Sequence, residues 1–185
     1  SKSRVGVDRV CWQVVRSVGR GREGSGKEED VVREVRQLAA SVCREVVRTG
    51  IQISSYGMDF IQKTDGDYLE SGKDLRQTAQ KRQYLLNLVR EIAGVDGIER
   101  IRLGSLEPRI VTEEFAKGLA ALPQVCPHFH LSLQSGCNAT LKRMNSHYTA
   151  EEYYEKVSLL REVLERQAIT TDVIVGLPGE TEDEF

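Results

Sequence analysis

The chain of 185 residues lacks the sequence features that mark membrane, secreted and disulfide-bonded proteins. It contains no run of about 18 apolar residues, so no segment is predicted to cross a membrane as a helix. No charged and then apolar leader opens it, so no secretion signal is expected. Its four cysteines have no paired spacing, which argues against a disulfide framework and makes the reducing cytoplasm the expected location.

An excess of charge of one sign is also missing. The chain has 26 Lys and Arg against 28 Asp and Glu, which gives a net charge of -2. A broad electrostatic surface for nucleic acid is therefore not predicted. Apolar residues make up 39%, which suffices for the core of one domain and excludes a disordered chain.

The two ends suggest a piece of a longer protein. The chain starts at Ser1 without Met, and it stops at Phe185, directly after a helix-start signal formed by Thr181 and Glu184. Residues 1–27 are basic and broken by glycines, and we expect a short strand and an irregular loop there.

Helical and strand patterns alternate along the remainder. Capping boxes that begin at Ser25 and Thr149, and a cap at Thr112, predict helix starts. The periodicity predicts helices over 28–40, up to 93, after 112 and over 149–164, and strands over 45–51, 98–104, 128–134 and 168–175. Strand–helix order repeated about five times predicts a parallel sheet, as a barrel or as an open doubly wound sheet.

The side chains of the predicted strands favour a barrel or partial barrel. On one strand His128, His130, Ser132 and Gln134 share one side, and Phe129, Leu131 and Leu133 share the other. The pairs Arg100 with Arg102 and Thr170 with Asp172 repeat this alternation. One face is thus predicted to pack on helices, and the other to line a wet interior that holds a ligand. An antiparallel sheet with a solvent face is the alternative, and the intervening helices count against it.

Four stretches resemble a known family: TGIQISSYG (49–57), RIRLGSLEPRI (100–110), PHFHLSLQSGCNATLKRMN (127–145) and TTDVIVGLPGETEDEF (170–185). On these residues the chain resembles the radical S-adenosylmethionine (SAM) methylthiotransferases that modify tRNA, and most closely the subgroup that acts on N6-threonylcarbamoyladenosine. The resemblance implies an α/β fold, a partial (β/α)6 open barrel with about five strand–helix units present. It divides the chain into a degraded cluster-loop region, 1–27, and a truncated barrel core, 28–185.

The resemblance implies SAM and a [4Fe–4S] cluster as cofactors, and tRNA as a partner bound through domains absent from this chain. In the family, three cysteines spaced C-x-x-x-C-x-x-C bind three irons of the cluster. Aligned on the segment 20–22 (RGR), this run places Cys11 second and puts Val7 and Val14 at the other two positions. Cys11 is then the lone metal-ligand candidate. Because valine has no donor atom, we expect the chain as written to lack the cluster and the activity.

The resemblance also implies where SAM is bound, at the carboxyl ends of the strands. The implied cofactor-binding residues are Thr49, Gly50, Ser105, Glu107, Gln134, Ser135, Arg143, Ile174 and Gly176. In this assignment the backbone at Thr49 and Gly50 binds the SAM amino group. Arg143 pairs with the SAM carboxylate, and Ile174 lines the adenine. Each residue taken alone is explained as well by a turn, a loop cap or a helix surface, and no catalytic residue is assigned.

Alternatives to the enzymatic interpretation stay open. The chain is also compatible with a cluster-free module that binds SAM or a nucleotide, and with a non-functional remnant. Cys126, His128 and His130, together with Cys137, give a zinc site as a further alternative. Structural zinc rarely uses such spacing on one strand, so this alternative is the weaker one.

Overall fold

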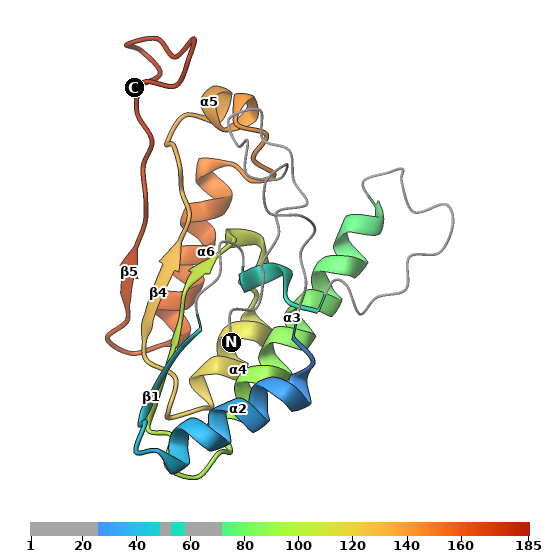
Figure 1. The fold of residues 1–185 in the computed structure, drawn as a ribbon. Coiled ribbons are helices and arrows are strands. Elements are labelled where there is room, and N and C mark those ends of the chain that lie inside the picture. Colours follow the sequence, from blue (N-terminus) through green and yellow to red (C-terminus); the bar gives the residue numbers. More distant parts are fainter. Residues whose placement is uncertain (1–25, 49–52, 58–71) are drawn as a thin grey trace.

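The computed structural model describes residues 26–48, 53–57 and 72–185, in which helices alternate with strands (Figure 1). The first half comprises α2 (Glu28–Ala40), β1 (Glu45–Arg48), the 3-10 turn η1 (Ile53–Ser55), α3 (Gly72–Ala93), β2 (Arg100–Leu103) and β3 (Ser105–Leu106). The second half comprises the 3-10 turn η3 (Pro108–Ile110), α4 (Glu113–Ala120), β4 (His128–Leu131), α5 (Asn138–Arg143), α6 (Ala150–Val163) and β5 (Ala168–Thr170).

Every strand pair in the described part of the chain is parallel. β1 pairs with β2, and β4 lies between β3 and β5. β2 and β3 follow each other along the chain with only Gly104 between them, so the two short sheets continue one another. The predicted α/β class with parallel strands is confirmed, and the antiparallel alternative is wrong.

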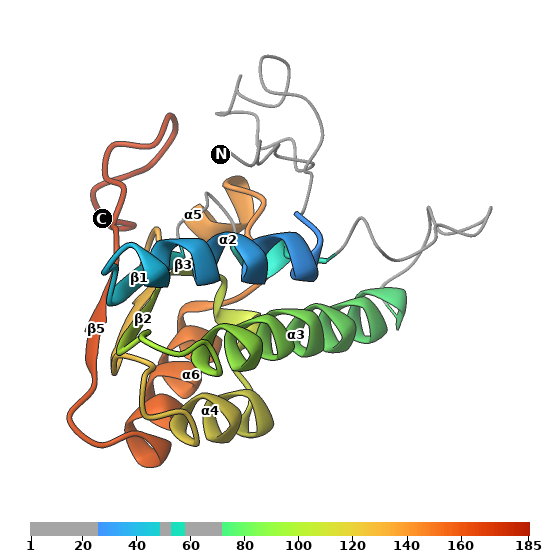
Figure 2. The same cartoon turned by 60° about the horizontal axis from the view of Figure 1, so that its bottom comes forward.

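The helices cover one face of the strands (Figure 2). On the covered face Ile101 of β2 and Phe129 and Leu131 of β4 are fully buried. They pack in one core with apolar side chains of α3, α4 and α6, among them Leu88, Leu119 and Leu160. This one-sided burial agrees with the predicted partial barrel and with the alternation of side chains on β4.

Two of the predicted helix starts are confirmed in atomic detail. The Oγ1 of Thr112 accepts a hydrogen bond from the N–H of Phe115 and caps α4. At α6 the Oγ1 of Thr149 accepts from the N–H of Glu152 at 3.2 Å, while the Glu152 carboxylate accepts from the N–H of Thr149 at 2.8 Å. This reciprocal pair is the capping box that the sequence predicts.

The other two predicted boxes do not cap a helix in the described part of the chain. Ser25 lies outside the described residues, and the N-cap of α2 is Lys27, which makes no side-chain cap. At Thr181 the N–H donates to the carboxylate of Glu184 at 3.0 Å, but residues 182–184 form a turn rather than a helix. Half of a capping box is therefore present there without the helix.

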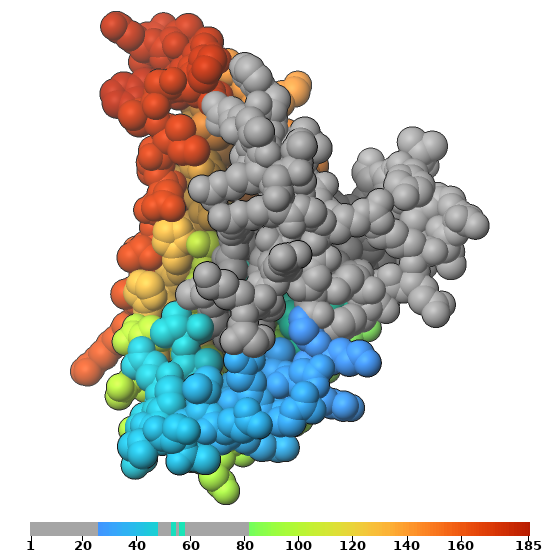
Figure 3. Space-filling model, in the orientation of Figure 1, coloured from blue at the N-terminus to red at the C-terminus, as the bar shows by residue number. Residues whose placement is uncertain are grey.

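The segment predicted as a strand over 168–175 pairs regularly only as far as Thr170. It meets β4 once more where Val173 bridges Gln134. β5 lies at one edge of its sheet, and the C-terminal segment continues along a margin of the molecule (Figure 3, red). Within the described ranges, no helix has the length and apolar character needed to span a bilayer.

A fully buried leucine of α6 tests whether the helical layer stabilises the sheet. Leu160→Ala should lower the free energy of unfolding by about 3 kcal/mol, because it leaves a cavity in the shared core. The matched control is Leu38→Ala on α2, where the leucine is 44% exposed and the loss should stay below about 1 kcal/mol. Urea denaturation of both variants measures the difference, and equal losses would contradict the described core.

Candidate functional site

Polar groups gather where β3 and β4 end, at one edge of the parallel sheet. Ser105 lies opposite His130 in the register. Beyond β3 the N–H of Glu107 donates to the Oγ of Ser54 at 2.8 Å, and the Glu107 carboxylate accepts from the Nε of Arg109 at 2.7 Å. Ser54 is buried, so this bond ties η1 firmly to the edge where β3 ends.

The end of β4 carries a β-bulge. His130 pairs with Thr170, whereas Gln134 bridges Val173, so four steps along β4 match three steps along β5. Gln134 has a φ of 71°, in the left-handed region that few residues other than glycine adopt. The bulge interrupts the alternation predicted over 128–134, and it changes the direction of the chain at a position assigned to SAM binding.

Hydrogen bonds from backbone N–H groups hold the bulge on the side of β5. The N–H of Leu133 donates to the Oγ1 of Thr171 at 2.8 Å. The N–H of Gln134 donates to the carbonyl of Asp172 at 3.0 Å, and the Gln134 carbonyl accepts from the N–H of Ile174 at 2.8 Å. The unusual backbone of Gln134 is thus bonded on both sides, and it lies directly beside the segment that carries Ile174.

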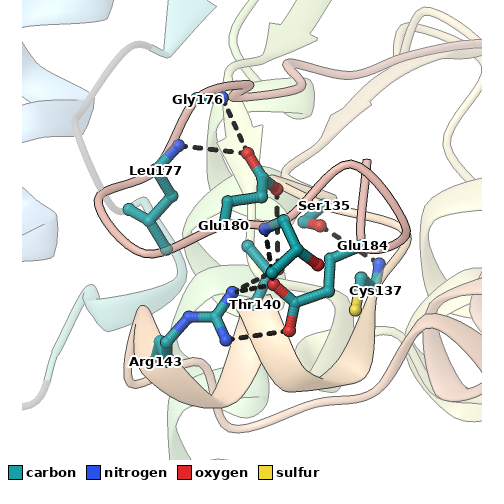
Figure 4. A network of polar contacts seen from close by, with 9 residues as sticks. Ser135, Cys137, Thr140, Arg143, Gly176, Leu177, Glu180 and Glu184 are labelled. Atoms are coloured by element: carbon teal, nitrogen blue, oxygen red, sulfur yellow. Dashed lines mark hydrogen bonds and ion pairs between the residues drawn. The ribbon is translucent and has the colours of Figure 1, made fainter.

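A network of polar side chains ties α5 to the C-terminal turn (Figure 4). The Nη1 and Nη2 of Arg143 donate to the two carboxylate oxygens of Glu184 at 2.9 and 2.7 Å. The same Nη2 donates to the Oγ1 of Thr140 at 3.1 Å, and this hydroxyl lies 3.5 Å from a carboxylate oxygen of Glu180. Forked pairs of this kind fix geometry as well as charge.

The fork of Arg143, which the resemblance assigns to the SAM carboxylate, therefore already holds a carboxylate. The hydrogen bonds from Arg143, and then the N–H of Thr181, lower the pKa of Glu184 to about 2. The Nε of Arg143 is buried and has no hydrogen-bond partner among the described residues. A ligand carboxylate would have to replace Glu184 to use the same fork.

The backbone at Gly176 is open to a ligand at the edge where the strands end. Its N–H and that of Leu177 donate to one carboxylate oxygen of Glu180 at 2.7 and 3.1 Å. Gly176 has a φ of 72°, and no heavy atom lies within 4 Å of the place where a Cβ would stand. Nearby, Ile174 is 40% exposed. An exposed apolar side chain next to an open glycine can accept a flat ring against the backbone.

Ser135 and Cys137 connect the bulge to α5. Ser135 is buried, and its Oγ accepts from the N–H of Cys137 at 3.1 Å. Cys137 is the N-cap residue of α5. Backbone N–H groups of the first turn, that of Thr140 foremost, hold the pKa of the Cys137 thiol below its usual value because they stabilise the thiolate.

Polar side chains of β4 and β5 meet on the face turned away from the helices. The Nδ1 of His130 lies 3.1 Å from the Oγ1 of Thr170, and its Nε2 lies 3.5 Å from a carboxylate oxygen of Asp172. The Nε2 of His128 lies 3.5 Å from the same threonine hydroxyl. Among the described residues, no group of three or more His, Cys, Asp and Glu is arranged to hold a metal, so the zinc alternative finds no support.

The structure brings together part of the predicted SAM site. The bulge, the C-terminal segment and α5 form one connected group that contains Gln134, Ser135, Arg143, Ile174 and Gly176. Ser105 and Glu107 join it through the pairing of β3 with β4. Thr49, Gly50 and Cys11 lie outside the described residues, as do the valines that stand at the other two cluster positions.

Sequence reasoning missed the residues that hold this edge together, namely Ser54, Thr140, Thr171, Glu180 and Glu184 as the partner of Arg143. Ser and Thr beside strand ends are common in any loop, so their type alone carried no signal. The acidic run near the C-terminus was visible, but only as a helix start.

Comparison with known proteins finds one matching family and a group of similar curated proteins that share one name. The family described as the Radical SAM superfamily matches residues 9–185. The curated tRNA-2-methylthio-N(6)-dimethylallyladenosine synthase of Acidothermus cellulolyticus is 38% identical over 181 residues, which cover 98% of this chain and 33% of that protein. The proteins of the same name from Geobacter metallireducens and Thermoanaerobacter sp. are each 38% identical over 97% of this chain, and 36% and 34% of those proteins are covered.

The chain therefore spans about a third of the length of these relatives. Their names refer to dimethylallyladenosine, so they do not support the threonylcarbamoyladenosine subgroup that the sequence motifs suggested. The match to the family runs through nearly the whole chain and includes most of residues 1–27. With the parallel strands and the polar strand-end edge, it leads to one conclusion: the chain belongs to the radical SAM superfamily.

Proposed function

We propose that residues 28–185 are the SAM-binding core of a tRNA methylthiotransferase, and that residues 1–27 are a cluster loop that has lost two of its three ligands. The observation that carries the proposal is the bulged end of β4, which lies against the open segment around Gly176 at the carboxyl edge of the parallel strands. This is the place where barrel enzymes bind their ligands. The names of the relatives supply the substrate class, a modified adenosine in tRNA.

In this proposal each part of SAM has its own contacts. Gln134 and Ser135 take the ribose and the amino-acid part, and Ile174 with Gly176 takes the adenine. Ser105 and Glu107 supply polar contacts from β3, and the backbone of Thr49 and Gly50 binds the amino group. Arg143 binds the SAM carboxylate only after exchange with Glu184, because its fork is filled.

The two cofactors of the family fit this chain differently. The exposed Ile174 and the open backbone of Gly176 suit a nucleoside such as the adenosine of SAM. A [4Fe–4S] cluster needs three thiolates from the loop, and Cys11 is the single cysteine in the run 7–14. The described residues offer no substitute group of ligands. The residues present do not fit the cluster, so no step of a reaction is assigned to it.

The substrate has two candidates. The relatives point to adenosine that carries a dimethylallyl group, whereas the motifs of the chain resembled the threonylcarbamoyladenosine subgroup. A cluster-free nucleotide-binding module and a non-functional remnant are the competing proposals, and the single thiol of the cluster loop favours them. The cytoplasmic location stays a prediction.

Binding of SAM tests the proposed core directly. Calorimetry should detect SAM binding to the chain, and Gly176→Ala should weaken it about tenfold, because the new Cβ occupies the open position and strains a left-handed backbone. Gly94→Ala, at the end of α3, is the matched control and should leave the affinity unchanged. No heat at millimolar SAM would remove both the core and the binding-module proposals.

Restoring the two missing cysteines tests the interpretation of residues 1–27. Anaerobic reconstitution should load no cluster on the chain as written, but Val7→Cys with Val14→Cys should gain about four irons and a visible absorbance band. Val5→Cys with Val10→Cys adds the same number of thiols at the wrong spacing and should gain none. Iron uptake by the unaltered chain, or equal uptake by both double variants, would refute the assigned positions.

The tRNA of the source cell separates the substrate candidates. Because the chain as written is expected to load no cluster, mass spectrometry of tRNA nucleosides should show an unchanged profile when its gene is deleted. Loss of methylthiolated dimethylallyladenosine would show an active enzyme for the substrate named by the relatives. Loss of methylthiolated threonylcarbamoyladenosine would instead support the subgroup suggested by the motifs. An unchanged nucleoside profile would favour the binding module or the remnant over an active methylthiotransferase.

A further inference from the structure

The hydroxyl of Tyr148 contacts the bulge from the side opposite to β5. Tyr148 lies in the connection between α5 and α6, and its ring is partly buried. The hydroxyl donates to the carbonyl of Ser132 at 2.7 Å and to that of Leu133 at 3.2 Å. These two residues lead directly into Gln134, so the tyrosine bonds to the part of β4 that departs from the regular ladder.

Pro108 explains why the carbonyl of Ser132 needs a donor from outside the sheet. In the pairing of β3 with β4, Leu106 lies opposite Leu131, and the N–H of Ser132 donates to the Leu106 carbonyl. If the ladder continued, the next bond to the Ser132 carbonyl would come from the N–H of residue 108. Proline has no N–H, so the ladder cannot continue at this point. The Tyr148 hydroxyl supplies the missing donor.

Burial keeps the tyrosine in the form that can donate. It raises the pKa of Tyr148 to about 12, against the opposing effect of a hydrogen bond with Ser146. The hydroxyl therefore keeps its proton throughout the neutral range. With the bonds from β5 to Leu133 and Gln134, the bulge is held from both sides.

We propose that Tyr148 is a positioning residue, whose hydroxyl fixes the bulged end of β4 so that Gln134 and Ser135 are presented to the nucleoside ligand. The inference rests on the proposed function for the identity of that ligand, which is SAM. The role of the hydroxyl in holding the bulge rests on the geometry alone.

Tyr148→Phe removes the hydroxyl and keeps the ring. The variant should raise the Kd for SAM about tenfold, because the partly buried carbonyl of Ser132 loses its donor and the bulge loses its fixed geometry. Hydrogen exchange at the amides of Gln134 and Ser135 should become faster in the same variant. Calorimetry and exchange mass spectrometry are run well below the thermal midpoint, so that global unfolding does not contribute.

Tyr153→Phe is the matched control. Tyr153 of α6 donates to the carbonyl of Leu131, at 3.4 Å, in the regular part of β4. Its variant should change neither the SAM affinity nor the exchange at Gln134. Equal affinities and exchange rates in both variants would overturn the role of Tyr148. If the unaltered chain fails to bind SAM, the proposed function falls, and the exchange rates alone then decide whether Tyr148 holds the bulge.

Discussion

One-sided burial of the parallel strands is the constraint on which the other features depend. Phe129 and Leu131 are sealed against the helices, which fixes the register and facing of β4 within the sheet. A one-residue slip would carry these side chains to the polar face, so the core allows only one alignment. The carboxyl end of β4 is thereby set beside β3 and β5, and the polar groups of the site meet there because the strands cannot slide.

Local patterns predicted those parts of the fold that local chemistry determines. The capping box at Thr149 needs only residues of one helical turn, and the alternation along β4 needs only one strand, so both could be recognised before any partner was known. The sequence order of strands and helices likewise predicted parallel pairing. The box predicted at Ser25 does not cap α2, because the helix begins at Glu28 with Lys27 as its N-cap.

The candidate site depends on partners far apart in the chain, and this limited what the sequence could predict. The bulge exists only in relation to the register of β5, so nothing within 128–134 announces it. Arg143 meets Glu184 across 41 residues, and Glu107 meets Ser54 across 53. A proline beside a strand removes a ladder donor, so Pro108 marks in the sequence where the ladder between β3 and β4 must stop. Which group replaces that donor requires the structure.

The filled fork of Arg143 bears on which part of a ligand this chain can recognise. Besides the backbone of Thr49 and Gly50, the resemblance gives the amino-acid part of SAM two further anchors, the iron–sulfur cluster and the guanidinium of Arg143. The first lacks two of its three thiolates, and the second is engaged by Glu184. What is left is the nucleoside end, where the bulge, the exposed Ile174 and the open Gly176 lie together. Under the proposed function, recognition would therefore rest on adenosine more than on methionine. The proposed methylthiotransferase core and the proposed cluster-free nucleotide module would then use the same residues.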